Sequence, residues 1–196
     1  MSYARRYGWI LALGVVLIVG GAAWNEWRKA SERASAEAFG TAVLTALEQE
    51  SPAARMRLLS EIETSGAQTG IIQLLSAGEL FETDRRGALG ALQAASEDVS
   101  LPDAYRQLAM LKRIIAGGAE IPVAEREALL ADLSQPGQPL RPMALEQRAL
   151  LALEQGEEQT AIEILTDLLE QSDVTSGLRQ RVSQLLVALG SPPGAG

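Results

Sequence analysis

The pattern of apolar and polar positions divides the chain into two parts of different kind. From Tyr7 to Asn25 no side chain is charged, and residues 10–19 read Ile-Leu-Ala-Leu-Gly-Val-Val-Leu-Ile-Val. A helix over these uncharged residues is roughly 28 Å long, close to the ~30 Å hydrocarbon thickness of a bilayer. The pattern therefore predicts a membrane-spanning helix over residues 7–27, preceded by a short cytoplasmic N-terminus at residues 1–6.

The residues at both ends of the apolar segment favour the same interpretation. Tryptophan rings prefer the headgroup level of a bilayer, and long basic side chains extend from a span toward water. The predicted membrane-interface anchors are Arg5, Arg6, Trp9, Trp24 and Trp27. Basic groups are about as frequent before the span as after it, so the charge rule for topology gives no orientation.

A cleaved secretory signal peptide is the alternative for this segment. It has the same short basic start and apolar stretch, and small residues at 21–23 or 34–36 offer cleavage sites. The apolar run is long and ends in tryptophan and basic residues, which favours a retained span over a cleaved one.

Beyond residue 27, apolar residues recur at helical spacing rather than in one block. The stripe Phe39, Ala42, Val43, Ala46 and Leu47 predicts that the first helix continues to about residue 50. No later segment alternates with a period of two, so no sheet is expected. The expected helices cover residues 53–62, 69–82, 85–95, 102–116, 122–133, 142–155, 157–171 and 176–189.

Local signals mark where several of these helices begin and end. Ser51 before Pro52 is a predicted N-cap, and Asp84 is another. Residues 100–103, Ser-Leu-Pro-Asp, match a capping box with proline just inside the helix. Gly66 is expected to close the helix at 53–62.

Eight or nine short helices with brief links favour a helical-repeat solenoid over a generic helix bundle. Residues 155–162 match the turn and second-helix start of a tetratricopeptide repeat, although the tryptophan and tyrosine positions of its first helix are missing. Ala161, Leu165 and Leu168 recur 73 residues earlier as Ala88, Leu92 and Ala95. The expected fold class is therefore all-α: one transmembrane helix, a tetratricopeptide-like domain over residues 28–190, and a disordered tail at 191–196.

Composition excludes several classes of chemistry. The chain has 17 basic and 25 acidic residues, a net charge of −8, and neither histidine nor cysteine. Residues 1–29 hold four basic and one acidic side chains, whereas residues 30–196 hold 13 and 24. An acidic domain argues against a nucleic-acid partner, and the missing residue types remove the usual general base, thiol nucleophile and zinc ligands.

The remaining polar residues suggest binding rather than catalysis. Paired acids lie next to each other in sequence near helix ends, where they face water or the helix dipole. We expect no enzyme activity, no cofactor, no metal and no small-molecule substrate. A solenoid presents a groove lined by the first helix of each pair. Two basic doublets are possible partner contacts that hold a carboxylate, or else solvated helix ends: Arg85, Arg86, Lys112 and Arg113.

Four segments carry a family resemblance: residues 20–28 (Gly-Gly-Ala-Ala-Trp-Asn-Glu-Trp-Arg), 105–109 (Tyr-Arg-Gln-Leu-Ala), 149–156 (Ala-Leu-Leu-Ala-Leu-Glu-Gln-Gly) and 172–175 (Ser-Asp-Val-Thr). In their order and spacing the chain resembles the YfgM-like family, single-pass inner-membrane tetratricopeptide-like proteins ancillary to the bacterial Sec translocon. Members of that family usually carry a longer polar segment before the span.

The resemblance implies a cytoplasmic N-terminus, a periplasmic repeat domain and an adaptor role. The implied partners are translocon subunits, periplasmic chaperones or client proteins, besides the lipid bilayer. The alternative is an accessory structural subunit of another inner-membrane complex, respiratory or photosynthetic.

Overall fold

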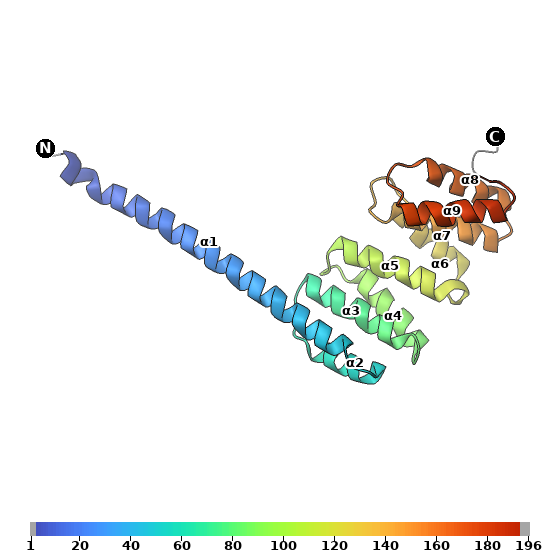
Figure 1. Cartoon of the computed structure of the whole chain (residues 1–196), viewed down its shortest axis with the longest axis horizontal. Coiled ribbons are helices and arrows are strands. Elements are labelled where there is room, and N and C mark those ends of the chain that lie inside the picture. Colours follow the sequence, from blue (N-terminus) through green and yellow to red (C-terminus); the bar gives the residue numbers. More distant parts are fainter. Residues whose placement is uncertain (1–2, 193–196) are drawn as a thin grey trace. The chain divides into compact units, whose positions relative to one another are not determined.

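The structure, a computed structural model, describes the backbone of residues 3–192 and the side chains of residues 20–192. Within these residues every regular element is helical (Figure 1). The chain divides into two compact units, Met1–Glu63 and Thr64–Gly196. The all-α class expected from the sequence is therefore confirmed for the described part of the chain.

The first unit consists of a long helix and a short one that packs against its end. Helix α1 spans Tyr3–Leu47, 45 residues, and α2 spans Pro52–Glu61. Ala46 and Leu59 are fully buried, and the other apolar residues of the predicted α1 stripe are half-buried. The predicted continuation of the first helix to about residue 50 is confirmed, because α1 runs without a break to Leu47.

Most of the predicted span lies outside the residues whose side chains the structure describes. Between residues 20 and 192, no helix carries an apolar stretch of the length that crossing a membrane requires. The apolar segment at residues 10–19 and the anchors Arg5, Arg6 and Trp9 fall outside that range, as does most of the tail predicted at 191–196.

The second unit is a succession of short helices in which each packs against its neighbour in sequence. Three residues link α7 to α8, so these two helices form a tight antiparallel hairpin. The 3₁₀ turn η1 was not expected from the sequence. The elements are α3 (Ala67–Leu80), α4 (Arg85–Glu97), α5 (Asp103–Gly117), η1 (Gly118–Glu120), α6 (Val123–Leu133), α7 (Arg141–Glu154), α8 (Glu158–Glu170) and α9 (Ser176–Ala188).

Two of the predicted helix starts are confirmed by their capping hydrogen bonds. Ser51 Oγ accepts the Ala54 N–H at 3.2 Å, and Pro52 is the first residue of α2. Asp84 Oδ1 accepts the Gly87 N–H at 2.9 Å at the start of α4. Each cap satisfies a backbone donor that a helix start would otherwise leave unpaired.

The capping box predicted at residues 100–103 is wrong. Helix α5 begins after Pro102, which caps it without any side-chain hydrogen bond. The Ser100 hydroxyl instead donates to Asp98 Oδ1 at 2.6 Å, and the Ser100 N–H donates to the same oxygen at 2.9 Å. Because the Ser100 hydroxyl is bonded to the carboxylate of Asp98, it does not cap the start of α5.

The role predicted for Gly66 is also wrong. Helix α2 already ends at Glu61, and Ile62 has an extended backbone. Gly66 is the N-cap of α3 and adopts a φ of 54°, a left-handed conformation that glycine reaches without strain.

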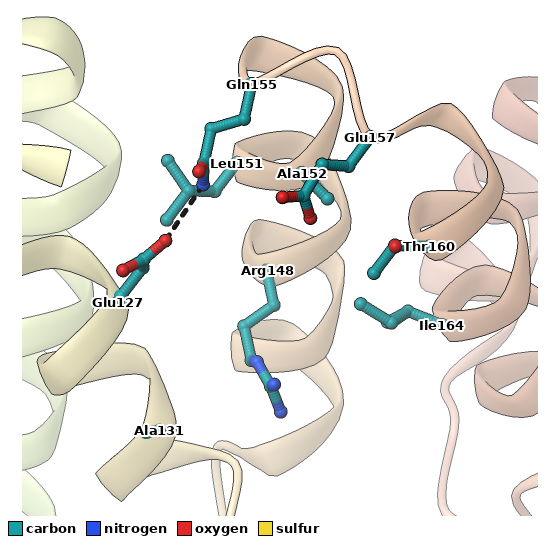
Figure 2. Close-up of a pocket in the computed structure, with 9 residues that line it drawn as sticks. All are labelled: Glu127, Ala131, Arg148, Leu151, Ala152, Gln155, Glu157, Thr160 and Ile164. Carbon is teal, nitrogen blue, oxygen red and sulfur yellow. Dashed lines mark hydrogen bonds between the residues drawn. The ribbon is translucent and has the colours of Figure 1, made fainter. Parts of the chain in front are cut away.

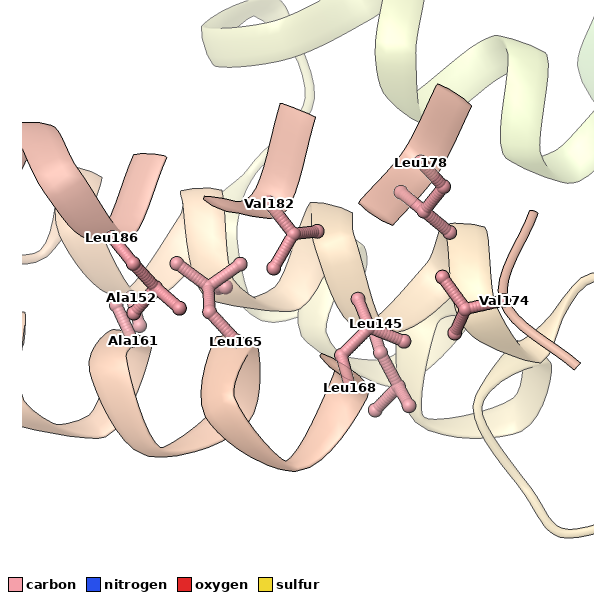
Figure 3. Packing of buried hydrophobic residues seen from close by; sticks show 10 residues of the cluster. Leu145, Ala152, Ala161, Leu165, Leu168, Val174, Leu178, Val182 and Leu186 are labelled. Atoms are coloured by element: carbon pink, nitrogen blue, oxygen red, sulfur yellow. The ribbon is translucent and has the colours of Figure 1, made fainter. Parts of the chain in front are cut away.

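The core confirms that the two repeats of the alanine–leucine pattern are buried. Side chains of α8 and α9 point toward one another and toward α7 (Figure 3). Ala161, Leu165 and Leu168 are fully buried there, and their counterparts 73 residues earlier in α4 are buried too. Two of these counterparts, Leu92 and Ala95, belong to a second cluster with residues of α3 and α5. Between these two clusters lies a third. It consists of Leu111, Ile114, Leu130, Leu133, Ala144 and Leu151.

Candidate functional site

Three alternate helices of the second unit, α5, α7 and α9, line an open groove of about 590 Å³. The lining positions of α7 and α9 are spaced by three or four residues, so each helix turns one face to the groove. The lining residues are Ile115 from α5, Glu146, Gln147 and Leu150 from α7, and Arg181, Gln184, Leu185 and Ala188 from α9. The three helices alternate along the chain with α6 and α8.

The groove has an exposed apolar floor. Ile115 is 54% exposed and Leu150 is 37% exposed, while Leu185 is half-buried. Leu185 also packs against the buried cluster of α7, α8 and α9, whereas Ile115 and Leu150 belong to neither that cluster nor the one between α5, α6 and α7. Apolar side chains that gather from separate helices in a hollow are typical of a binding surface.

An ion pair joins α7 to α9 at this groove. Arg181 Nε and Nη2 donate to Glu146 Oε1 and Oε2, both at 2.9 Å. The side chain of Glu146 is 9% exposed, whereas that of Arg181 is 55% exposed. The hydrogen bonds that Arg181 donates to Glu146 hold the pKa of Arg181 above its ordinary value. Because both carboxylate oxygens are occupied, the guanidinium is the charged group that solvent meets here.

A second ion pair lies in an adjoining hollow of about 160 Å³ between α5, α6 and α7. Arg126 Nη1 and Nη2 donate to Glu154 Oε2 and Oε1 at 2.6 and 2.7 Å. Here the arginine is the buried partner, at 6% exposure against 43% for the glutamate. Hydrogen bonds from Arg126 lower the pKa of Glu154, and the same bonds raise the pKa of Arg126. The two pairs therefore present opposite charges to solvent.

A further pocket, of about 280 Å³, lies between α6, α7 and α8 (Figure 2). Gln155 Nε2 donates to Glu127 Oε1 at 3.0 Å across its upper edge, and Arg148 Nη1 donates to Ser134 Oγ at 3.3 Å. Arg148 and the groove residue Leu150 are two positions apart, which corresponds to about 200° around a helix. This pocket therefore lies on a different face of α7 from the groove, and two of its polar residues, Glu127 and Gln155, are paired with each other.

In each predicted basic doublet one member is hydrogen-bonded to another part of the domain. Arg85 donates to Glu120 and to the Ala116 carbonyl, and so links α4 to the end of α5. Arg113 Nη1 donates to Glu125 Oε1 at 2.7 Å. Arg86 and Lys112 are exposed. The predicted partner contacts therefore remain available at Arg86 and Lys112, and Lys112 lies one helical turn before Ile115.

Of the predicted membrane-interface anchors, Trp24 and Trp27 lie in the described part of α1. Both are largely exposed, and their ring centroids are 5.3 Å apart with planes tilted by 40°. Two neighbouring indole rings on an exposed helix face fit an interfacial position, where a ring is apolar over its body and polar at its N–H.

Metal ligation and pKa shifts can be compared across the titratable groups of the described residues. In residues 20–192 no three acidic side chains come together in a way that could hold a metal ion. Every shifted pKa moves toward the charged form: Ser100 hydrogen bonds lower that of Asp98, and Arg106 lowers that of Asp103.

Sequence reasoning did not single out the residues that line the groove. Glu146 and Arg181 are 35 positions apart, so no local pattern pairs them. Leu150 stands beside the buried Leu151 in an uninterrupted apolar run, and only the packing of neighbouring helices separates exposed from buried.

The comparisons with known proteins add no family to this picture. Family models, curated proteins and solved structures all yield no match to the chain.

Proposed function

We propose that this protein is a membrane-anchored periplasmic adaptor that binds other proteins through a tetratricopeptide-like domain. The observation that carries the proposal is the open, apolar-floored groove on alternate helices of the second unit. Repeat domains bind partners on such surfaces. The anchor is supported by the uncharged apolar segment in the first half of α1 and by the exposed Trp24 and Trp27.

The proposed setting is the bacterial inner membrane, with a single span, a cytoplasmic N-terminus and a periplasmic domain. Its partners are translocon subunits, periplasmic chaperones or client proteins. The acidic charge of residues 30–196 supports a protein partner over a nucleic acid. No catalytic role is proposed.

Affinity purification of the tagged full-length protein from detergent-solubilised membranes tests this function. We expect translocon subunits or periplasmic chaperones among the proteins identified by mass spectrometry, and not in a purification of an unrelated single-span protein with the same tag. Recovery of the protein with neither class would contradict the translocon assignment.

The alternative is an accessory subunit of another inner-membrane complex, with the span packed against that complex. It is favoured by small residues at 8, 12 and 20 of the apolar segment, which suit close helix contact. Migration with a respiratory or photosynthetic complex on a native gel would support this alternative against the translocon.

A further inference from the structure

We propose that the groove lined by α5, α7 and α9 binds a peptide segment that combines apolar with acidic side chains. The inference rests on the proposed adaptor function and specifies the chemistry of the partner at this surface. It is carried by the apolar floor of the groove, by the one charge that its lining exposes, and by two amides that have no partner.

The apolar floor sets the first requirement of a ligand. Ile115, Leu150 and Leu185 come from three different helices and line the same groove. A row of apolar side chains on a partner would cover all three, and would remove from water an apolar surface that the fold itself leaves exposed.

The exposed charge sets the second requirement. Of the residues that line the groove, Glu146 and Arg181 are charged. The Glu146 oxygens are both occupied and the side chain is buried, so a cation has no access to them. Arg181 uses Nε and Nη2 for this pair, which leaves Nη1 as an accessible donor. A carboxylate on the ligand can accept a charge-assisted hydrogen bond from this nitrogen.

The neighbouring cation adds to this preference. Lys112 is exposed on α5, one helical turn before Ile115, and makes no ion pair in the described part of the chain. The exposed carboxylate of Glu154 stands at the other hollow, beside Arg126. An acidic ligand therefore meets attraction at Arg181 and repulsion at Glu154, which fixes the direction in which it lies.

Two glutamines supply hydrogen bonds for the ligand backbone. Gln147 on α7 and Gln184 on α9 both line the groove, and neither side chain bonds to another described residue. A carboxamide both donates and accepts, so each matches the paired N–H and C=O of a peptide unit. These amides favour a peptide over a small acidic molecule as the occupant.

Fluorescence anisotropy with the full-length protein in nanodiscs tests the proposal. The probes are a labelled leucine–glutamate peptide and two counterparts in which glutamine or lysine replaces every glutamate; empty nanodiscs correct for lipid binding. We expect the glutamate peptide to bind about ten-fold more tightly than the glutamine peptide, and the lysine peptide not to bind.

Variants locate the binding on the molecule. Ile115→Ser should weaken binding of the glutamate peptide about ten-fold, because the substitution removes apolar contact area from the floor of the groove. Val187→Ser is the matched control, since Val187 is exposed on α9 but does not line the groove. Equal binding of the three peptides, or full binding by Ile115→Ser, would overturn the proposal. Self-association of the unaltered protein that Ile115→Ser abolishes would also overturn the proposal, because the occupant of the groove would then be a second copy of the chain.

The same variants separate this inference from the adaptor function. If translocon or chaperone partners still co-purify with Ile115→Ser as with the unaltered protein, the groove is not their binding surface and the inference fails while the function stands. If no such partner co-purifies but the peptide binds as expected, the translocon assignment fails and the groove specificity stands.

Discussion

Two Arg–Glu ion pairs of the second unit differ in which partner is buried. In one ion pair the glutamate is buried beneath an exposed arginine, Glu146 beneath Arg181. In the other the arginine is buried beneath an exposed glutamate, Arg126 beneath Glu154. An exposed group can return to water when its partner is lost, whereas a buried one cannot. The exposed member of each pair is therefore the one whose deletion should cost more.

The pair between α7 and α9 gives a direct test. Arg181→Met leaves the buried Glu146 carboxylate without its donors, and we expect a loss of about 2 kcal/mol in the free energy of unfolding. Glu146→Gln leaves Arg181 half-exposed and solvated, and we expect a loss below about 1 kcal/mol. Urea denaturation followed by circular dichroism measures both, and the reverse order of the two losses would contradict the burial argument.

The pH dependence of stability follows from the other pair. Arg126 lowers the pKa of Glu154 in the folded protein, while the unfolded value is about 4.3. A depressed folded pKa gives stability that is fully present above the unfolded pKa and is lost as the pH falls through the folded one. We expect stability to fall with acidification below about pH 4.

Glu154→Gln should flatten this acid limb, as read from the thermal midpoint across a pH series. It should not abolish the limb, because the carboxyls of Asp98 and Asp103 also have lowered pKa values. An acid limb as steep as that of the unaltered protein would show that the Arg126 contact contributes nothing.

At the scale of elements, the link between α7 and α8 depends on one backbone conformation. Gly156 has a φ of 79°, in the left-handed region that glycine adopts without penalty. Gly156→Ala should therefore destabilise the domain by about 1 kcal/mol. In the interior of α4, Gly90 has a helical backbone, and an added Cβ would meet nothing within 4 Å. Gly90→Ala should stabilise the domain by about 0.8 kcal/mol. The measurement is the thermal midpoint, which should fall for Gly156→Ala and rise for Gly90→Ala.

Elements were predictable where a local signal had no competitor. The helical pattern located every α-helix of the second unit to within about two residues, and Ser51 and Asp84 cap as expected. The capping-box prediction was wrong because the Ser100 hydroxyl bonds to Asp98 instead, and this bond depends on the conformation of the turn before α5. The groove was not predictable in detail, because Leu150 and Leu151 have the same side chain and differ only in what packs over them.

At the scale of the whole molecule, the absence of cysteine from the sequence provides a test of topology. Any cysteine introduced into the chain is unique and can be labelled without background. Val99 is 86% exposed in the link between α4 and α5, so Val99→Cys gives a thiol that a reagent can reach from the solvent around the domain. Ser2→Cys places the thiol before the predicted span instead.

We expect a maleimide that cannot cross the inner membrane to label Val99→Cys in intact cells and Ser2→Cys only after lysis. The labelled Val99→Cys protein should stay with the membrane after washing at high pH, because an apolar span is held by the hydrocarbon core. Labelling of Val99→Cys only after lysis would place the domain in the cytoplasm and reverse the proposed orientation. Release of a shortened protein that lacks residue 2 would instead show a cleaved signal peptide. These outcomes differ in which thiol is labelled and in which fraction it is found, so one pair of variants decides between a tethered adaptor, one of reversed orientation and a protein released by signal-peptide cleavage.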